Sequence, residues 1–347
     1  MLRDLTIQNY RCFEDFQIDG LGQVNLFVGN NNSGKTSLLE AIYLLVGDNP
    51  ANAILGILLL RGEIIDDIYN VEYRTNSRRF VHLESIKHIF YKYQTDTDNK
   101  LTILSKKNKD TKDDLTITAK PKELHFSKLT DSNLDDKEYS LPLLSEKDIL
   151  DLSKKPVSYT DGNNIYLSSK KENSGYLAFL WNNVYLTDKE DKVVHALKML
   201  KPNLERIGFF QNKQYNTVRL KLSTQDQPVP INSMGDGMYR LLTISIALVT
   251  AENGVLLVDE IETGLHYEAQ TYMWRLVLET AKELNVQVFA TTHSWDCITA
   301  YQEALSQVED QSIGKLFRLD SKYGKLRAVE YDAGDLDIAV REGIEVR

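Results

Sequence analysis

The sequence predicts an α/β fold in which a mixed β-sheet with flanking helices is interrupted by a mainly β lobe. Near both ends of the chain, short apolar stretches that suit buried strands alternate with stretches of helical apolar spacing. Between them the composition shifts to Lys, Asp, Ser and Asn, with short alternating segments between charged turns. The predicted organisation is therefore an N-terminal core part at 1–95, an inserted charged lobe at 96–185 and a C-terminal core part at 186–347.

Length and composition describe a globular protein. The 347 residues suffice for about two domains of roughly 150 residues each, and the 42% of hydrophobic residues can fill a core. No apolar run is long enough to span a bilayer, and the first residues lack the pattern of a signal peptide. We therefore expect a cytoplasmic protein with no membrane partner.

Charge and cysteine content narrow the partners further. A net charge of -9 argues against a protein surface that is basic throughout and attracts nucleic acid over its whole extent. The basic groups at 74–79 and 106–109 have two interpretations. They could form a local DNA-binding patch, or they could be ordinary charged side chains in contact with solvent, which is the simpler interpretation. Cys12 and Cys297 are far apart and form no CxxC pair, so we expect two small buried apolar side chains and neither a disulfide nor a zinc site.

The first elements place a phosphate-binding motif between a strand and a helix. Apolar spacing predicts strands at 4–10, 13–18 and 23–29, and a helix at 35–46. Residues Gly29–Thr36 fit the pattern GxxxxGK[ST] between the last of these strands and the helix. Backbone amides and the helix N-terminus would surround the phosphates of ATP or GTP.

Two side chains of this motif have individual roles. Lys35 would place its charge on the β- and γ-phosphates, and the Thr36 hydroxyl can ligate Mg²⁺. The predicted nucleotide-binding residues of the segment are Asn30, Asn31, Asn32, Ser33, Gly34, Lys35, Thr36 and Ser37.

The middle of the chain carries weaker signals. Apolar spacing suits a helix at 80–93, and short strands are expected at 100–105, 114–120 and 164–169. No heptad pattern is sustained, which excludes a long coiled-coil arm.

The C-terminal part has a second candidate anion site. A helix is predicted at 188–200 and strands at 204–210 and 216–222. Ser233, Gly235 and Gly237 then precede a strongly apolar helix. A hydroxyl, free amides and the positive end of a helix dipole could bind a second phosphate there, although a glycine-rich helix cap explains the same residues.

Acidic residues and a histidine follow two apolar strands. The strand Val255–Val258 precedes Asp259 and Glu260, which places both carboxylates at the carboxyl edge of a sheet. Asp259 would hold the Mg²⁺ shell, and Glu260 would polarise the attacking water. A later strand brings His293 to a comparable edge, where an imidazole could hydrogen-bond the γ-phosphate.

In this order the four motifs resemble those of ABC-type P-loop ATPase heads: Walker A, signature, Walker B and switch histidine. The opening "LTIQNYRCFEDFQI" and Asn31 are similar to the RecF, SMC and OLD-type (overcoming-lysogenization-defect) group. The stretches "GDGMYRLL", "VDEIETGLH" and "FATTHSWDCI" look especially like OLD-type ATPases, which are often found in bacterial antiphage systems. The resemblance covers about 1–65 and 185–347.

The resemblance implies a homodimer that closes head to tail on ATP, with each nucleotide between the Walker A of one chain and the signature of the other. It places Arg11 at the nucleotide and makes Glu260 the catalytic base. The signature residues that would meet the partner's γ-phosphate are Ser233, Gly235, Asp236 and Gly237. The loop "IETGLH" departs from the transporter pattern, which leaves the inter-subunit role of Glu262 to His266 open. The sequence also shows no recognisable glutamine loop, and Gln94 is not predicted to be its glutamine.

Many OLD-type proteins continue into a Toprim nuclease domain. Here Asp335 and Asp337 form a DxD pair, for which we expect a turn rather than a metal site, and a Toprim-like nuclease would be a separate effector. The expected function is ATP hydrolysis coupled to DNA or to such an effector, in bacterial defence or DNA maintenance. The alternatives are a nucleotide-binding subunit of a membrane transporter and an ATP-bound regulatory scaffold without turnover.

Overall fold

The computed structural model describes most of the chain as two compact units. The first unit contains residues 1–21, 32–162 and 320–328, and the second contains residues 22–31, 163–319 and 329–347. The described residues are 1–63, 86–93, 99–108, 111–120, 123–130, 133–142, 160–211, 216–322 and 324–347.

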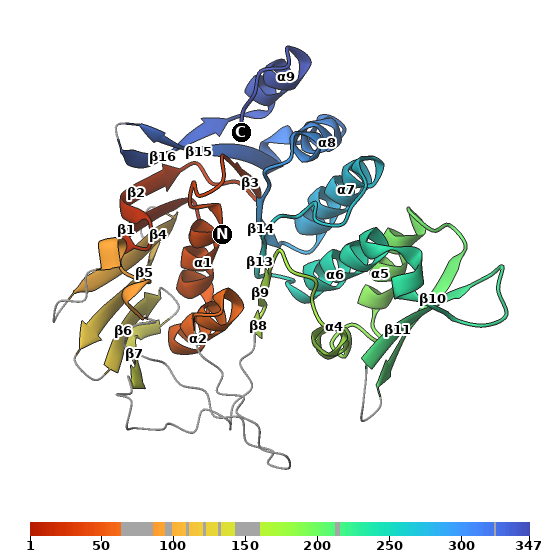
Figure 1. Ribbon diagram of the computed structural model, residues 1–347, viewed down its shortest axis with the longest axis horizontal. Helices are drawn as coiled ribbons and strands as arrows, with labels where there is room; N and C mark the ends of the chain where they lie inside the picture. Colours follow the sequence, from red (N-terminus) through yellow and green to blue (C-terminus); the bar gives the residue numbers. More distant parts are fainter. Residues whose placement is uncertain are drawn as a thin grey trace. The chain divides into compact units, whose positions relative to one another are not determined.

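The first unit is built on a six-stranded antiparallel sheet in the order β2-β1-β4-β5-β6-β7. Residues along β6 alternate between buried and partly exposed, as in a sheet with one solvated face. Helices α1 and α2 pack on one face (Figure 1). The elements are β1 (Asp4–Tyr10), β2 (Phe13–Asp19), α1 (Lys35–Val46), α2 (Pro50–Arg61), η1 (Tyr91–Tyr93), β4 (Lys100–Asn108), β5 (Thr111–Lys120), β6 (Glu123–Thr130), β7 (Asn133–Pro142) and β8 (Thr160–Asp161).

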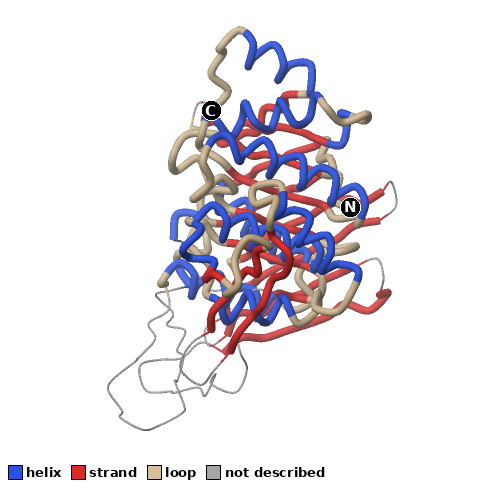
Figure 2. The backbone as a smooth tube through the Cα atoms, turned by 90° about the vertical axis from the view of Figure 1, so that its right-hand side faces the viewer, coloured by secondary structure: helices blue, strands red, loops and turns tan. Residues whose placement is uncertain are grey.

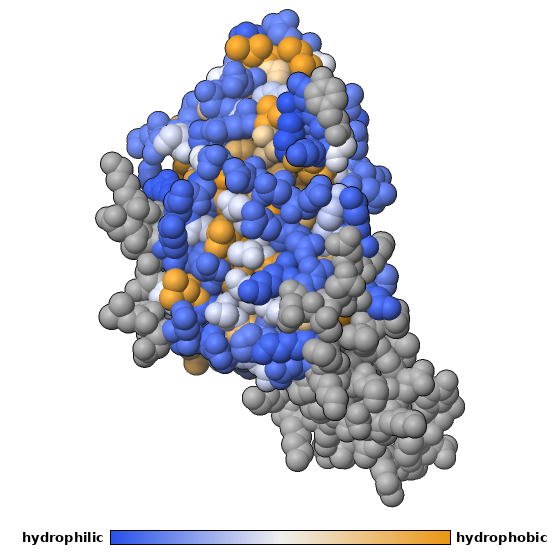
Figure 3. Space-filling model, turned by 90° about the vertical axis from the view of Figure 1, so that its left-hand side faces the viewer, coloured by the Kyte–Doolittle hydropathy of each residue, from blue (hydrophilic) through white to orange (hydrophobic). Residues whose placement is uncertain are grey.

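The surface on the side of this sheet is mainly hydrophilic. Figure 3 views the molecule from the side on which β4 to β7 lie in Figure 1, and the apolar side chains on that face are scattered rather than gathered. Within the described ranges of the whole chain, no helix is both long and apolar enough to cross a membrane.

The second unit contains a parallel sheet that positions the predicted site. Its strands run in the order β15-β3-β14-β13-β9, and adjacent pairs are parallel. Val258 at the end of β13 pairs with Leu167 of β9 and with Ala290 of β14, so these strands end at one edge. The strands are β3 (Val24–Val28), β9 (Asn164–Leu167), β13 (Val255–Val258), β14 (Gln287–Thr291) and β15 (Gly314–Lys322). The chain passes between the two units along the end of β15 and along β16 (Lys325–Tyr331).

Helices of the second unit pack side by side in the order α5, α6, α7, α8, α9 (Figure 2). The Tyr301 hydroxyl of α8 donates a hydrogen bond to the Val24 carbonyl, which ties this layer to β3. A small sheet, β10-β11-β12, lies beyond α4 and α5. The elements are α4 (Ser174–Trp181), α5 (Asp188–Lys198), β10 (Leu204–Gln211), β11 (Asn216–Leu222), β12 (Val229–Pro230), η3 (Ile231–Met234), α6 (Asp236–Thr250), α7 (Tyr267–Glu283), α8 (Trp295–Ser306), η4 (Gln311–Ile313) and α9 (Ala333–Arg341).

The predicted middle lobe is arranged differently from expectation. Its strands are present, but β4 pairs with β1, so that the N-terminal strands and β4 to β7 form one sheet. Residues 163–185 belong to the second unit, because β9 pairs with β13. The unit boundaries therefore do not coincide with those predicted at 95 and 185.

Other expectations have mixed outcomes. The turn expected around Asp335 and Asp337 is wrong, because the Asp332 side chain caps helix α9 and both residues lie inside that helix. Cys297 is buried as expected, whereas Cys12 is only half-buried, and both are free thiols. The basic group at 74–79, Gln94 and most of the helix expected at 80–93 lie outside the described residues.

Candidate functional site

The Walker A loop leaves the carboxyl edge of the parallel sheet after β3 and ends where α1 begins at Lys35. Gly29 and Gly34 have φ angles of 148° and 90°, a region that favours glycine. A Cβ atom on Gly34 would lie 2.8 Å from the Cys12 sulfur, so a larger residue would also clash. No side-chain cap hydrogen bond is formed at the start of α1, and the N-terminus of a helix is a position that favours an anion.

The side chains of this loop fit a phosphate ligand. Asn30, Asn31 and Asn32 are exposed, and the buried Ser33 hydroxyl has no hydrogen-bond partner in the structure. Ser37 differs, because it is buried and accepts a hydrogen bond of 3.3 Å from Arg61. Its predicted contact with the nucleotide stays a prediction.

Arg11 lies in a buried ion-pair cluster beside α1. Its guanidinium nitrogens lie 3.1 and 3.2 Å from the Glu63 carboxylate oxygens and 2.9 Å from Glu40 Oε2. Only 7% of the Arg11 side chain is exposed. The structure thus gives Arg11 two carboxylate partners, and its role at the nucleotide stays a prediction.

Asp259 and Glu260 follow β13 and are fixed by Thr291 at the end of β14. The Thr291 hydroxyl donates to Asp259 Oδ1 at 2.6 Å and accepts the Glu260 backbone N–H at 2.8 Å. Glu260 has a φ angle of 46°, an unusual conformation for a residue with a side chain. The turn therefore stores local strain at the predicted catalytic base.

His293 faces two carboxylates. Its Nδ1 atom lies 3.4 Å from Glu260 and 3.8 Å from Glu262. The Thr292 hydroxyl donates to one oxygen of Glu262 at 2.7 Å, while the other oxygen is buried without a partner. Burial raises the pKa of Glu262. Glu262 is thus a buried carboxylate next to His293. The sequence had not indicated Glu262 as a site residue.

Glu262→Gln should raise the melting temperature at about pH 8 and change it little near pH 4. The raised pKa means that folded Glu262 holds its proton more tightly than the unfolded side chain, whose ordinary value is 4.5. Stability is therefore lost as the pH rises from that value through the folded pKa, and a neutral amide lacks this loss. Thermal unfolding at both pH values, with the exposed Glu268→Gln as control, measures the difference. Equal shifts at both pH values would contradict it.

The signature segment is an exposed, uncapped helix start. Ser233, Gly235 and Asp236 are exposed, and α6 begins at Asp236 without a side-chain cap. The Ser233 hydroxyl donates to the Pro230 carbonyl at 2.7 Å. Gly237 passes close to the loop after Walker B, since a Cβ atom there would lie 3.1 Å from the Gly264 carbonyl oxygen.

Arg240 is a further site residue that sequence reasoning missed. It is buried, and its guanidinium donates to the carbonyl oxygens of Asp259 and Glu260, each at 3.0 Å. Burial lowers the pKa of Arg240. A single arginine inside the apolar helix "MYRLLTISIALV" was the available signal, because a buried charge needs specific partners.

The metal-binding prediction concerns Thr36 and Asp259. Among the residues that the structure describes, no three His, Cys, Asp or Glu side chains gather so as to hold a metal ion. A carboxylate and a hydroxyl suit Mg²⁺ when phosphate oxygens and water supply its other ligands. Thr36 and Asp259 have these two types of side chain, and their joint role at Mg²⁺ stays a prediction.

A glycine-bearing loop between strand and helix, with an acidic pair and a histidine at the same sheet edge, defines a P-loop ATPase of the ABC type. Residues 24–296 match the family described as "AAA domain, putative AbiEii toxin, Type IV TA system". The chain therefore belongs to this family, within the RecF, SMC and OLD group of ABC-type ATPases.

Curated relatives support the same group. An "ATP/GTP phosphatase" of Helicobacter pylori is 25% identical over 93% of this chain and 94% of its own length. A "DNA replication and repair protein RecF" of Enterococcus faecalis is 50% identical over 44 residues, which are 13% of this chain and 12% of that protein. An "OLD nuclease" of Thermus scotoductus is 46% identical over 48 residues, 14% of this chain and 9% of that protein.

Solved structures confirm the predicted fold class. An SMC head bound to the C-terminal winged-helix domain of ScpA matches with a TM-score of 0.53 at 11% identity, covering 95% of this chain and 98% of that chain. An SMC head from Pyrococcus furiosus with an extended coiled coil matches with a TM-score of 0.51, also at 11% identity, and covers 99% of both chains. The chain therefore has the fold of an ABC-type ATPase head.

Proposed function

We propose that this protein hydrolyses ATP with Mg²⁺ between two chains that associate head to tail. The observation that supports this most is the sheet edge at which Asp259, Glu260 and His293 lie and from which the Walker A loop leaves. Nucleotides bind outside the carboxyl ends of strands in open α/β sheets. Full-length similarity to an ATP/GTP phosphatase agrees with this chemistry.

The residues have distinct roles in this proposal. Amides of the Walker A loop and Lys35 bind the phosphates, and Thr36 and Asp259 hold the Mg²⁺ shell. Bound Mg²⁺ would neutralise charge that develops on the phosphate oxygens. Glu260 polarises the attacking water. His293 directs Nδ1 at the carboxylates, which leaves its other ring nitrogen for the γ-phosphate.

The signature segment would complete the site of the partner chain. Ser233, Gly235 and Asp236 are exposed, and the uncapped start of α6 presents amide groups and a positive dipole end. These features suit a phosphate that comes from outside the chain. An ATP molecule would then link two chains, and hydrolysis would release them.

The dimer would act on DNA or on an effector protein, in bacterial defence or DNA maintenance. The short matches to a DNA replication and repair protein and to an OLD nuclease support this class of partner. The family description, which names a toxin system, supports defence. A Toprim-like nuclease, carried on a separate chain, is the effector we propose.

The test is the Glu260→Gln variant. Without the carboxylate, ATP hydrolysis should fall by about 10²- to 10⁴-fold, the usual contribution of a general base. ATP binding should persist, and dimers should accumulate in size-exclusion chromatography with light scattering. Hydrolysis at the wild-type rate would contradict the role of Glu260.

A pull-down with this variant and ATP identifies the partner. A recovered nuclease or stimulation of the wild-type ATPase by DNA would support the proposal. A recovered membrane permease would favour the transporter alternative, and wild-type protein that binds ATP without releasing phosphate would favour the scaffold.

A further inference from the structure

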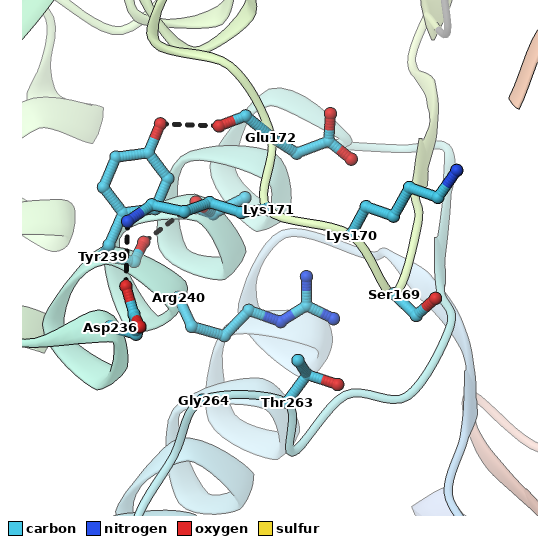
Figure 4. A pocket seen from close by; sticks show the side chains of 10 residues that line it. Ser169, Lys170, Lys171, Glu172, Asp236, Tyr239, Arg240, Thr263 and Gly264 are labelled. Carbon is cyan, nitrogen blue, oxygen red and sulfur yellow. Dashed lines mark hydrogen bonds and ion pairs between the residues drawn. The ribbon is translucent and has the colours of Figure 1, made fainter.

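A chain of polar contacts connects the exposed signature segment with the backbone of the Walker B turn inside one chain. We call Lys171, Tyr239 and Arg240 the bridge. Tyr239 and Arg240 lie on α6, and Lys171 lies in the loop that follows β9 (Figure 4). None of the three is among the predicted site residues, although Tyr239 and Arg240 lie in the stretch "GDGMYRLL".

Arg240 forms the inner end of the bridge. Besides the Asp259 and Glu260 carbonyls, its guanidinium donates to the Ser168 carbonyl at 3.1 Å. A buried guanidinium satisfied by carbonyl oxygens on two loops fixes both loops relative to α6. One of these carbonyls belongs to Glu260 itself, whose backbone has the strained φ angle of 46°.

Lys171 and Tyr239 form the outer end. The Lys171 ammonium lies 2.8 Å from the signature residue Asp236 and 3.3 Å from the side-chain oxygen of Asn232, which directly precedes the signature. It also lies 4.5 Å from the centre of the Tyr239 ring. The Tyr239 hydroxyl donates to the Glu172 carbonyl at 2.7 Å, so the loop after β9 is joined to both ends of the bridge.

The bridge has room to change its conformation. A pocket of about 140 Å³ lies beside it, lined among others by Lys171, Tyr239, Arg240 and Thr263. Side chains next to an unfilled space can move without opening a packed core. Arg240 is four residues after Asp236, where α6 starts, so a displacement of the helix start moves it within one turn.

We propose that Arg240 and Lys171 are positioning residues that couple the signature segment of a chain to the catalytic Glu260 of the same chain. This rests on the proposed function, because the signature responds only to ATP held by a partner. Docking of that ATP at Ser233–Gly237 fixes the position of α6. Arg240, which lies on α6 and donates to the Glu260 carbonyl, then fixes the position of the Glu260 backbone. Each site of the dimer thereby promotes hydrolysis at the other. Because the coupling of binding is reciprocal, ATP bound at one site must raise the ATP affinity of the other by the same factor.

The experiment compares ATP hydrolysis by Arg240→Lys and Lys171→Met with that of the wild type. The wild type should show a Hill coefficient above 1, with two sites setting the upper limit. Both variants should keep a Hill coefficient above 1, because the dimer still forms on two ATP molecules, but lower kcat by about 2- to 30-fold, the range for residues that modulate the coupling between sites. The ATP affinity of the monomer should stay within about twofold, because Lys35 and Thr36 are untouched.

Lys189→Met is the matched control. Lys189 also lies 2.8 Å from a carboxylate, that of Glu252, but it contacts neither motif. Its Hill coefficient and kcat should equal those of the wild type. Lys171 is exposed, so Lys171→Met tests the bridge even if Arg240→Lys does not fold.

Dimer formation separates this inference from the proposed function. In a Glu260→Gln background with ATP, chains carrying Lys171→Met should still dimerise, which places the defect after docking. Loss of those dimers would assign Lys171 to docking and overturn the coupling role. A wild-type kcat in both variants would overturn the inference alone. Absence of dimers in Glu260→Gln itself would overturn the proposed function and the inference together.

Discussion

Lys35→Ala should remove nucleotide binding at concentrations that saturate the wild type. Lys35 opens α1 directly after Gly34, and its ammonium would carry the charge opposite the β- and γ-phosphates. Truncating one partner of a buried charged pair costs about 2–5 kcal/mol, which weakens binding by about 30-fold to several-thousand-fold. Isothermal titration calorimetry with ATP and Mg²⁺ measures the loss.

A control separates this loss from a change in total charge. Lys198→Ala removes an exposed cation from the last turn of α5 and should leave ATP affinity unchanged. The melting temperature of Lys35→Ala without nucleotide should remain close to that of the wild type, while the stabilisation that ATP gives should vanish. An affinity within threefold of the wild type, which is about 0.6 kcal/mol, would exclude Lys35 from phosphate binding.

Local pattern predicted the elements of the ATPase core well. The helix predicted at 35–46 is α1, and the strand at 216–222 is β11, because apolar spacing and flanking turns agree there. The carboxyl-edge position of Asp259 and His293 also followed from pattern, since two apolar strands of a parallel sheet must end together.

Long-range pairing was beyond the reach of pattern. The strands of the middle lobe were predicted, but the pairing of β1 with β4 joins residues about a hundred positions apart, and no local signal encodes that register. The same limit applies to the contacts of the site. In the sequence Glu262 looked like an ordinary charged residue, and Arg240 was marked only by the apolar helix around it. The carbonyls around Arg240 and the Thr292 hydroxyl beside Glu262 became visible only in the structure.

Helix α1 also depends on an ion-pair cluster that no motif marks. Glu40, on the second turn of α1, is 4% exposed and lies 2.9 Å from Arg11 and 2.5 Å from Arg61. The Tyr10 hydroxyl donates to it at 3.3 Å. Glu63 binds Arg11 from the other side, so two guanidinium groups and two carboxylates compensate one another near the end of the Walker A loop.

Glu40→Ala should therefore destabilise the chain by about 3–5 kcal/mol, the usual effect of leaving a buried charge without its partner. The Arg11 side chain is only 7% exposed, and Glu63 would be the one carboxylate that it retains among its contacts in the described residues. Urea denaturation followed by circular dichroism measures the change in the free energy of unfolding. ATP binding should weaken as well, because Glu40 fixes the helix whose first residue is Lys35.

The matched control is Glu330→Ala, which removes the partner of Lys315 at the same distance of 2.5 Å. That pair is 24% and 40% exposed, so its loss should cost only about 0–1 kcal/mol. Glu40→Gln keeps the shape of the side chain and should lie between the two, since the amide retains one oxygen as an acceptor for Arg61 or Arg11. Equal costs for Glu40→Ala and Glu330→Ala would show that burial does not strengthen this cluster, and α1 would then depend on its apolar face alone.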